Sequence, residues 1–565
     1  MSFFTQASFV MDPNVYGVGK LYVSKPTDGS GDLTFTRASN GTRVNQDGLI
    51  EKVRTNLLTY SNDFSNAAWS QYLYGGGSFV RTYSQADPFG GTTAAKFDIS
   101  VGTGGVLFTQ NFTTTANAEH GLSVWLKGAV GGEKVQIDLK STSSSGVAGG
   151  LLTLTTEWVR YKITANNDAA TARGFQFRVT ASQISGSETF YVYGAQAETG
   201  VPTDYIATTT AAVSVGPTAN VPRLNYSNGC PSLLLEPQRT NLIPYSETFD
   251  GATYVRTATT IQKGFLSPDG YLNASKLLED NTNSIHRIYQ TSLVTASPSA
   301  TMSVYVKYNG RKFVLMRIAD SSVGRWYNLE TGTLGGASFG TPSNSTIQSV
   351  GGGWYRITIS HTVSSQARFE MWISDTESVS AYQGDVTKGV YLYGTQVEVG
   401  SYASSYIPTL GASVTRLADA AYKTGIASLI GQSEGTIFLD YEKNKSSIGE
   451  PIWLSDGTYN QFIYLSEGSN ITFIGVRYGS QWSISSGTLA NGRHKIAAAY
   501  KQNDIVLYID GVQIGTDTSA NVPNCSLLGL GYENGTIYNN ANPYKQVLLF
   551  KTRLSNADLA RLTSF

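Results

Sequence analysis

An internal repeat constrains this chain more than any other feature. The segment Arg54-Thr55-Asn56-Leu57 recurs as Arg239-Thr240-Asn241-Leu242, 185 residues later. Three further blocks match in the same order: residues 123–127 with 303–307, 158–160 with 354–356, and 193–198 with 393–398. A shared order with slowly changing offsets indicates two copies of one module. The second copy carries a net insertion of 16 residues, which we place between residues 307 and 354.

The repeated blocks are short, and they are rich in β-branched and aromatic residues. Residues 354–359 (WYRITI) alternate between apolar and polar positions, which is typical of a strand. Charged residues make up only 15% of the chain, whereas Gly (59) and Tyr (34) are abundant. The sequence therefore predicts an all-β protein with two β-sandwiches of the same strand order. We place them at residues 45–208 and 229–409, with linkers at 209–228 and 410–431.

A different pattern follows the second copy. Residues 435–441 alternate clearly, and residues 504–515 predict a hairpin whose turn is Asp510-Gly511. Ser555 is the expected N-cap of one short helix, with Asp558 at its third position. Residues 432–565 are therefore expected to form a third β-sandwich.

The N-terminal segment, residues 1–44, is too short for a core of its own, and we expect it to become ordered on a partner. A short motif that contains an arginine occurs at residues 35–38 and recurs at residues 221–224 and 414–419. Its arginines are Arg37, Arg223 and Arg416. We interpret it as a linker motif that opens each following module.

Several function classes are disfavoured by composition. Lys+Arg and Asp+Glu are both 41, and this zero balance argues against a nucleic-acid-binding protein. No apolar run is long enough to insert into a membrane, and the N-terminus does not resemble a secretory signal. The two cysteines, Cys230 and Cys525, form no disulfide framework. No nucleophile elbow or histidine metal motif occurs, so we expect neither an enzyme nor a cofactor.

A metal site is left unassigned by the sequence. Some jelly rolls hold a structural Ca²⁺ through clustered carboxylates and carbonyls. No Asp-x-Asp-x-Asp-Gly loop occurs in this chain, so such an ion cannot be assigned to particular residues.

The repeated blocks carry a resemblance to a known group of proteins. Asn-Leu-Leu-x-x-Ser-x-x-Phe, Ser-Val-Trp-Leu-Lys, Trp-x-Arg-Tyr and Tyr-Gly-Ala-Gln-x-Glu resemble jelly-roll modules of the carbohydrate-binding-module superfamily. The residues of these motifs are most similar to those in modules of tailed-bacteriophage head-fibre and tail-fibre proteins. Residues 492–496, 508–511 and 554–558 are similar to concanavalin-like, laminin-G-like sandwiches.

This resemblance implies a structural protein on the exterior of a phage virion, a head or tail fibre. It implies attachment to virion proteins through the N-terminal segment, a homotrimeric state, and presentation of carbohydrate-binding modules to a host-surface glycan. A purely architectural decoration subunit without ligand binding is the alternative. A polysaccharide depolymerase is less favoured, because no β-helix period is visible.

Two sets of residues are candidates for particular roles. Arg54 with Glu198, and Arg239 with Glu398, are expected to form structural ion pairs between the first and last strands of each module. Sugars stack on exposed aromatic rings, so aromatic residues without a counterpart in the other copy are the candidate ligand-binding residues. A trimer seam would use the same residue types. These candidates are Trp326, Tyr327 and Trp372 in the second module, and Tyr478, Trp482, Tyr532 and Tyr538 in the third domain.

Overall fold

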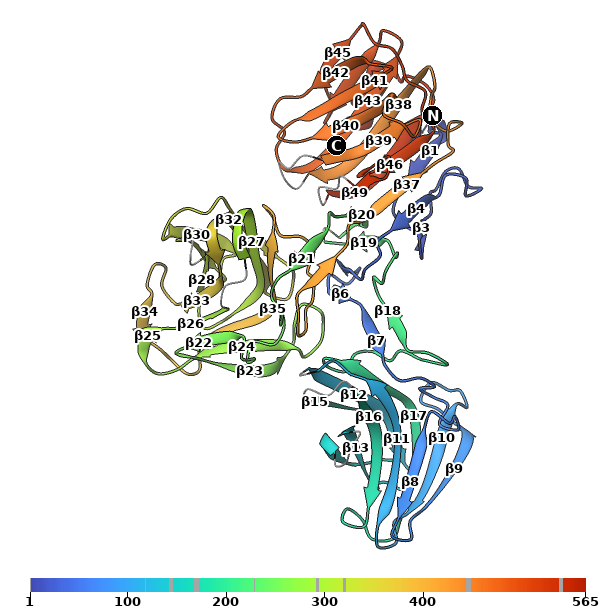
Figure 1. Cartoon of the computed structure of the whole chain (residues 1–565), viewed down its shortest axis with the longest axis vertical. Helices are drawn as coiled ribbons and strands as arrows, with labels where there is room; N and C mark the ends of the chain where they lie inside the picture. Colours follow the sequence, from blue (N-terminus) through green and yellow to red (C-terminus); the bar gives the residue numbers. More distant parts are fainter. Residues whose placement is uncertain are drawn as a thin grey trace.

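The computed structural model describes residues 2–116, 118–141, 146–166, 172–227, 229–290, 294–318, 322–443, 449–537 and 542–565. The chain forms three lobes, each a β-sandwich (Figure 1). In the described ranges the helices are α1 (Phe3–Gln6) and α2 (Asn556–Thr563). Neither is long and apolar enough to span a bilayer. The all-β fold class predicted from the sequence is therefore confirmed.

The first module consists of two antiparallel five-stranded sheets that enclose an apolar core. One sheet has the order β15-β12-β17-β10-β9, and the other has the order β14-β13-β16-β11-β8. Phe64, Phe97 and Phe177 lie fully buried between them. The strands are β8 (Ser70–Tyr74), β9 (Ser78–Gln85), β10 (Ala94–Ser100), β11 (Gly105–Thr113), β12 (Glu119–Gly128), β13 (Lys134–Ser141), β14 (Gly146–Thr153), β15 (Val159–Asn166), β16 (Ala172–Thr180) and β17 (Ser187–Thr199).

The second module repeats this strand order, as predicted, and adds one edge strand to each sheet. Its sheets have the orders β31-β32-β27-β35-β24-β23 and β30-β29-β28-β33-β26-β22. The added strands, β30 and β31, lie within the expected insertion. The strands are β22 (Tyr254–Thr257), β23 (Thr259–Phe265), β24 (Ala274–Glu279), β26 (Arg287–Gln290), β27 (Val294–Asn309), β28 (Phe313–Ile318), β29 (Val323–Asn328), β30 (Thr333–Ser338), β31 (Asn344–Ser349), β32 (Trp354–Ala367), β33 (Phe369–Ser374) and β35 (Gly389–Val399), with a side hairpin of β25 (Asn283–Ile285) and β34 (Ala381–Gln383).

The third sandwich corrects the expected domain boundaries, because it is assembled from separate parts of the chain. Strand β1 pairs with β49, and β4 pairs with β37, which in turn pairs with β46. Phe9, Leu21 and Phe35 are buried in the core of this sandwich. The N-terminal segment, which we expected to become ordered on a partner, therefore shares a core with the C-terminal domain.

The sandwich has an eight-stranded and a nine-stranded sheet, and α2 packs on the outside of the first. Ser555 caps α2 by accepting a hydrogen bond from the Asp558 amide, as predicted. The first sheet contains β1 (Phe9–Met11), β19 (Arg223–Asn225), β20 (Ser232–Leu235), β49 (Asn542–Phe550), β38 (Glu434–Lys443), β43 (Gly492–Lys501), β44 (Ile505–Ile509) and β45 (Val512–Asp517). The second contains β2 (Tyr16–Gly17), β3 (Lys20–Leu21), β4 (Leu33–Thr36), β37 (Ala420–Lys423), β46 (Leu527–Leu530), β39 (Gly449–Ser455), β40 (Gln461–Glu467), β41 (Ile471–Arg477) and β42 (Ser480–Ser485).

Both jelly rolls are consequently insertions into the third sandwich. The chain leaves the sandwich after β4, passes through the hairpin of β5 (Thr42–Val44) and β6 (Ile50–Lys52), forms the first module and returns at β19. It leaves again after β20, forms the second module and returns at β37. Each insertion is closed by a two-stranded stem: β7 (Arg54–Asn56) pairs with β18 (Val213–Val215), and β21 (Arg239–Asn241) pairs with β36 (Val414–Arg416). Both chain termini lie in the third lobe (Figure 1).

The three arginines of the repeated linker motif meet in one buried cluster, which we call the arginine node. Arg37 Nη1 lies 2.9 Å from Asp419 Oδ1, and Arg223 Nη2 bonds the other oxygen of the same carboxylate. Arg223 and Arg416 both contact Glu236 Oε2, at 2.6 and 3.0 Å. Burial alone would raise the pKa of Glu236, but Arg416 and Arg223 hold it well below its ordinary value. The arginine node therefore connects the N-terminal segment, the returning strand β19 and the stem strand β36.

Candidate functional site

The outer face of the sheet β14-β13-β16-β11-β8 in the first module carries exposed tyrosines beside polar side chains, of which Thr109, Asp138 and Gln176 are buried. Strand register places Tyr72, Leu107, Arg178 and Gln136 in one row across this sheet. The next row contains Ser70, Thr109, Gln176 and Asp138. Paired residues of neighbouring strands point to the same face, so both rows face away from the core.

Two tyrosines form the aromatic part of this face. Tyr72 is 63% exposed and Tyr74 is 39% exposed. Their rings stack at 5.8 Å with an interplanar angle of 28°. Both residues belong to β8, an edge strand whose five residues are all exposed. The rings are therefore accessible to a ligand from solvent.

The polar part of the face is a connected set of side chains. Gln136 Nε2 donates to Asp138 Oδ1 at 2.7 Å, and Arg178 Nε lies 2.8 Å from Asp138 Oδ2. Burial raises the pKa of Asp138, while Gln136 and Arg178 oppose this shift. Gln176 is 3% exposed, and its Nε2 has no hydrogen-bond partner among the described residues. A buried amide donor without a partner is costly unless a ligand or water satisfies it.

The corresponding face of the second module is different in character. Trp326 and Trp372 lie side by side there with Leu315, but they are only 1% and 5% exposed. Tyr327 points into the core and donates its hydroxyl to the Thr358 carbonyl at 2.6 Å. The expectation that these three rings offer an open stacking surface is therefore wrong: the tryptophans are buried in a cluster against which Ile285 and Phe313 pack, and the tyrosine is a core residue.

The candidates of the third domain are divided between surface and core. Tyr478 is 71% exposed in the turn after β41, and its hydroxyl accepts a hydrogen bond from Gln461 Nε2 at 3.1 Å. Trp482 is buried in the core, and its Nε1 donates to the Asn521 carbonyl at 3.0 Å. Tyr532 stacks on Tyr422 at 4.3 Å and is half-buried. Tyr538 lies outside the described residues.

A pair of carboxyl groups lies near Tyr464 on the outside of the nine-stranded sheet. Burial and the charge of Glu533 raise the pKa of Glu450 to about 8. Trp453 lies beside Tyr464, but it is only 2% exposed.

Among the described residues, no three His, Cys, Asp or Glu side chains are grouped so as to hold a metal ion. This part of the chain therefore gives no position for the Ca²⁺ that the sequence left open.

The predicted structural ion pair is present in one module only. Arg239 Nε lies 3.7 Å from Glu398 Oε2. Arg54 instead donates to the Tyr271 hydroxyl and lies 4.3 Å over its ring, which connects the first module to the second. Glu198 accepts a hydrogen bond from the Thr203 amide at 2.7 Å, and so holds the loop that follows the last strand of the module.

Tyr72 and Tyr74 were not among the residues selected from the sequence. At the offset of 185 their counterparts are Thr257 and Thr259. The rule that selected Trp326 and Trp372, an aromatic residue in one copy only, therefore applies to both tyrosines. Their Tyr-Leu-Tyr spacing on a strand would have placed the two rings on the same face.

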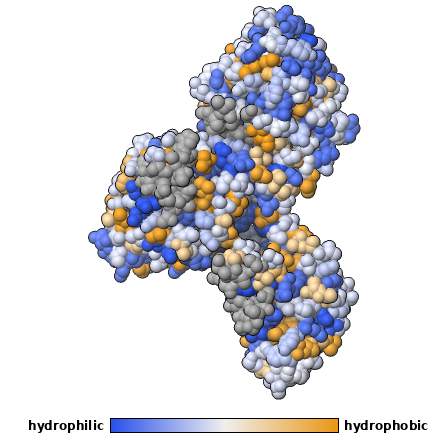
Figure 2. Space-filling model, viewed as in Figure 1, coloured by the Kyte–Doolittle hydropathy of each residue, from blue (hydrophilic) through white to orange (hydrophobic). Residues whose placement is uncertain are grey.

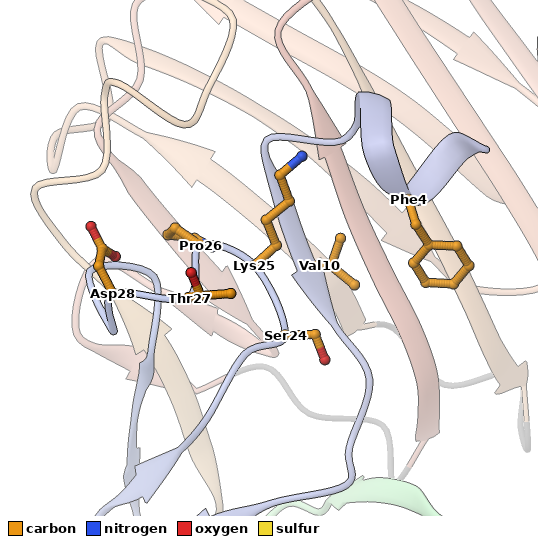
Figure 3. A pocket seen from close by; sticks show the side chains of 7 residues that line it. All are labelled: Phe4, Val10, Ser24, Lys25, Pro26, Thr27 and Asp28. Atoms are coloured by element: carbon orange, nitrogen blue, oxygen red, sulfur yellow. The ribbon is translucent and has the colours of Figure 1, made fainter. Parts of the chain in front are cut away.

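Two hollows lie away from these faces. A groove of 510 Å³ beside the N-terminal strand is lined by Phe4, Val10 and residues 24–28 (Figure 3). Its charged groups are used internally, since Lys25 donates to the Thr5 carbonyl and Asp28 accepts from Ser30. A cleft of 400 Å³ lies where Lys52 and Arg54 meet the loop of Asp269 and Tyr271.

Apolar residues on the face drawn in Figure 2 lie in small groups among polar ones.

Comparison with known proteins gives only distant similarities. No family model matches the sequence, and no curated protein matches it. The sialidase CBM40 of Ruminococcus gnavus is 16% identical, covering 24% of this chain and 86% of that chain, with a TM-score of 0.22. A CBM4 structure is 15% identical, covering 28% and 99%, with a TM-score of 0.20. Domains LG4-5 of the mouse laminin alpha1 chain are 12% identical, covering 56% and 94%, with a TM-score of 0.17. The ligand of this chain has to be inferred from its own side chains.

Proposed function

We propose that this chain is a carbohydrate-binding protein and that the outer face of β14-β13-β16-β11-β8 holds the saccharide. The observation that carries the proposal is the pair of exposed, stacked tyrosines next to a row of amide, carboxylate and guanidinium groups. An apolar sugar face would lie on Tyr72, and its hydroxyls would exchange hydrogen bonds with Gln136 and Arg178, which are partly exposed.

We further propose that the protein belongs to the exterior of a phage virion, as a head or tail fibre that attaches to the host surface. The support is the resemblance of the repeated blocks to modules of phage fibre proteins. A chain with several sandwiches suits this role, since weak single sites gain avidity of about 10²–10⁴ when they are linked. Mass spectrometry of purified virions tests the location. Absence of the protein from the virions would contradict the assignment.

The binding test uses the full chain on a glycan array, followed by titration of the best ligand. Tyr72→Ala and Tyr74→Ala are expected to weaken binding by roughly 10-fold or more, since ring stacking contributes about 1–3 kcal/mol in comparable aromatic contacts. Tyr83→Ala is the matched control, because Tyr83 is also 39% exposed but lies on β9 in the other sheet. If all three variants bind like the parent, the tyrosine face does not hold the ligand. If no glycan binds, the architectural alternative is favoured.

A further inference from the structure

Three arginines converge on one buried carboxylate on the outer face of the second module. Arg287 Nη1 lies 2.6 Å from Glu370 Oε1, and Arg317 Nη1 and Arg368 Nη2 lie 3.3 and 3.7 Å from Glu370 Oε2. Glu370 is fully buried, and it also accepts a hydrogen bond from Trp372 Nε1 at 2.7 Å. Among the described residues, three guanidinium groups therefore surround one carboxylate in this cluster.

Aromatic rings hold these guanidinium groups in place. Arg287 and Arg368 lie over the Tyr289 ring at 5.2 and 5.0 Å, and Arg317 lies over the Phe339 ring at 4.3 Å. The arginine side chains are still 25%, 18% and 32% exposed, in the order 287, 317 and 368. They are thus oriented before a ligand arrives and remain reachable from solvent, which favours bidentate recognition of two oxygens of an anion.

The charge of this face is not a consequence of the shared fold. Strand register and the repeat offset place Arg287 at the position of Leu107, and Arg317 at the position of Asp138. Glu370 occupies the position of Gln176. The first module therefore presents a neutral amide row with one balanced ion pair at the positions where the second module presents arginines around one carboxylate. Two copies with the same core have acquired different outer faces.

We propose that the outer face of β30-β29-β28-β33-β26-β22 binds an anionic group, a carboxylate or a sulfate, carried by a polysaccharide. Anion binding rests on the arginines alone, while the saccharide part of the ligand rests on the proposed carbohydrate-binding function. The two modules would then select different chemistry: neutral hydroxyl-rich sugar on the first and acidic sugar on the second.

The test measures binding of the full chain to polygalacturonate, dextran sulfate and neutral dextran by affinity electrophoresis. We expect retardation by at least one of the anionic polymers, weakening as salt is added, and none by dextran at the same concentration. Arg368→Ala and Arg317→Gln are each expected to weaken anionic binding by roughly 10-fold, the value of a hydrogen bond to a charged group. Lys312→Ala is the matched control, since it removes one positive charge from the same module at a separate ion pair with Glu330.

Two features keep the result interpretable. Arg368 is the most exposed and most distant of the three, so its loss leaves Glu370 with two arginines and Trp372 as partners, and Arg368→Ala is expected to melt like the parent. Tyr72→Ala is expected to leave anionic binding unchanged, which separates this site from that of the first module. Equal binding of all polymers, an equal effect of Lys312→Ala, or retention by double-stranded DNA alone would overturn the proposal. A carboxylate ligand and a sulfate ligand are distinguished by which polymer is retained more strongly.

Discussion

Asp419 joins separate segments of the chain at the junction of the three lobes. Its carboxylate bonds Arg37 from the N-terminal segment and Arg223 from the first returning strand, and it accepts the Glu236 amide at 2.8 Å. All three charged side chains at this point are fully buried. Removing one partner of a buried ion pair leaves a charge without compensation, which costs more than the pair itself contributes.

We expect Asp419→Asn to destabilise the third sandwich by about 3–5 kcal/mol, because Arg37 and Arg223 would stay buried without their shared carboxylate. Urea unfolding followed by intrinsic fluorescence measures the change. Asp504→Asn is the control: Asp504 is 49% exposed in its ion pair with Arg553, so the loss there should stay below about 1 kcal/mol. Equal destabilisation by the two variants would show that the node has no special role.

The Glu450 carboxyl gives the third sandwich a pH dependence of definite sign. Burial and the neighbouring Glu533 raise its pKa to about 8 in the folded chain, whereas the pKa of a glutamate in an unfolded chain is about 4.3. The folded state therefore binds more protons between these values, and stability falls as pH rises from about 4.3 towards about 8. We expect Glu450→Gln to flatten this part of the profile of melting temperature against pH. Parallel profiles for the parent and the variant would contradict the assignment.

At the scale of single elements, the hairpin of β47 (Tyr532–Glu533) and β48 (Thr536–Ile537) depends on one glycine. A Cβ added to Gly529 would lie 2.0 Å from the Tyr532 carbonyl oxygen. Backbone cannot move aside as a flexible side chain does, so Gly529→Ala should displace the hairpin and break the stacking of Tyr532 on Tyr422. We expect faster proteolytic cleavage near residues 532–537 than in the parent. Gly487→Ala is the control for a glycine substitution in an exposed loop, since no atom lies within 4 Å of its Cβ position and its φ is not positive. Equal cleavage of parent and Gly529→Ala would contradict this role.

Much of the element-scale structure could be predicted from the repeat. Matching blocks identified the strands, and the offset change located the added strands β30 and β31. The binding candidates were less predictable, because an unmatched aromatic residue can face outward, as Tyr72 does, or be covered, as Trp326 is. Whether a ring is covered depends on loops from other parts of the chain, and alternation within one strand carries no information about those loops.

At the scale of the whole molecule, the order of domains along the chain is not their order in space. The sequence predicted consecutive modules, because each arginine motif lies next to a module boundary. In the structure the same three motifs meet in the arginine node, and the third sandwich closes around two insertions. Pairing between residues hundreds of positions apart, such as β1 with β49, leaves no local signal in the sequence.

This arrangement predicts that fragments will differ sharply in their ability to fold. Residues 53–216 contain both sheets of the first module and its stem, so we expect a folded fragment with cooperative unfolding. Residues 432–565 lack the buried side chains of Phe9, Met11, Leu21, Leu33 and Phe35. Each contributes roughly 1.5–3 kcal/mol, a sum comparable to the total stability of about 5–15 kcal/mol.

We therefore expect the fragment 432–565 to be unfolded or aggregated, and co-expression with residues 1–36 alone not to restore it, because β20 and β37 would still be missing. Circular dichroism and the dispersion of amide resonances report the outcome for each fragment. A well-dispersed spectrum from residues 432–565 alone would contradict the shared core.

The two stems also determine how such a chain can change over evolutionary time. Each inserted module enters and leaves through adjacent paired strands, so its two ends lie only one strand spacing apart, about 4.8 Å. Recombination within a stem would deliver a foreign module whose ends already meet at the required distance, while the arginines that anchor the scaffold stay in place. Lineages that share the scaffold could then exchange whole inserted modules, and acquire a new binding specificity in one genetic event.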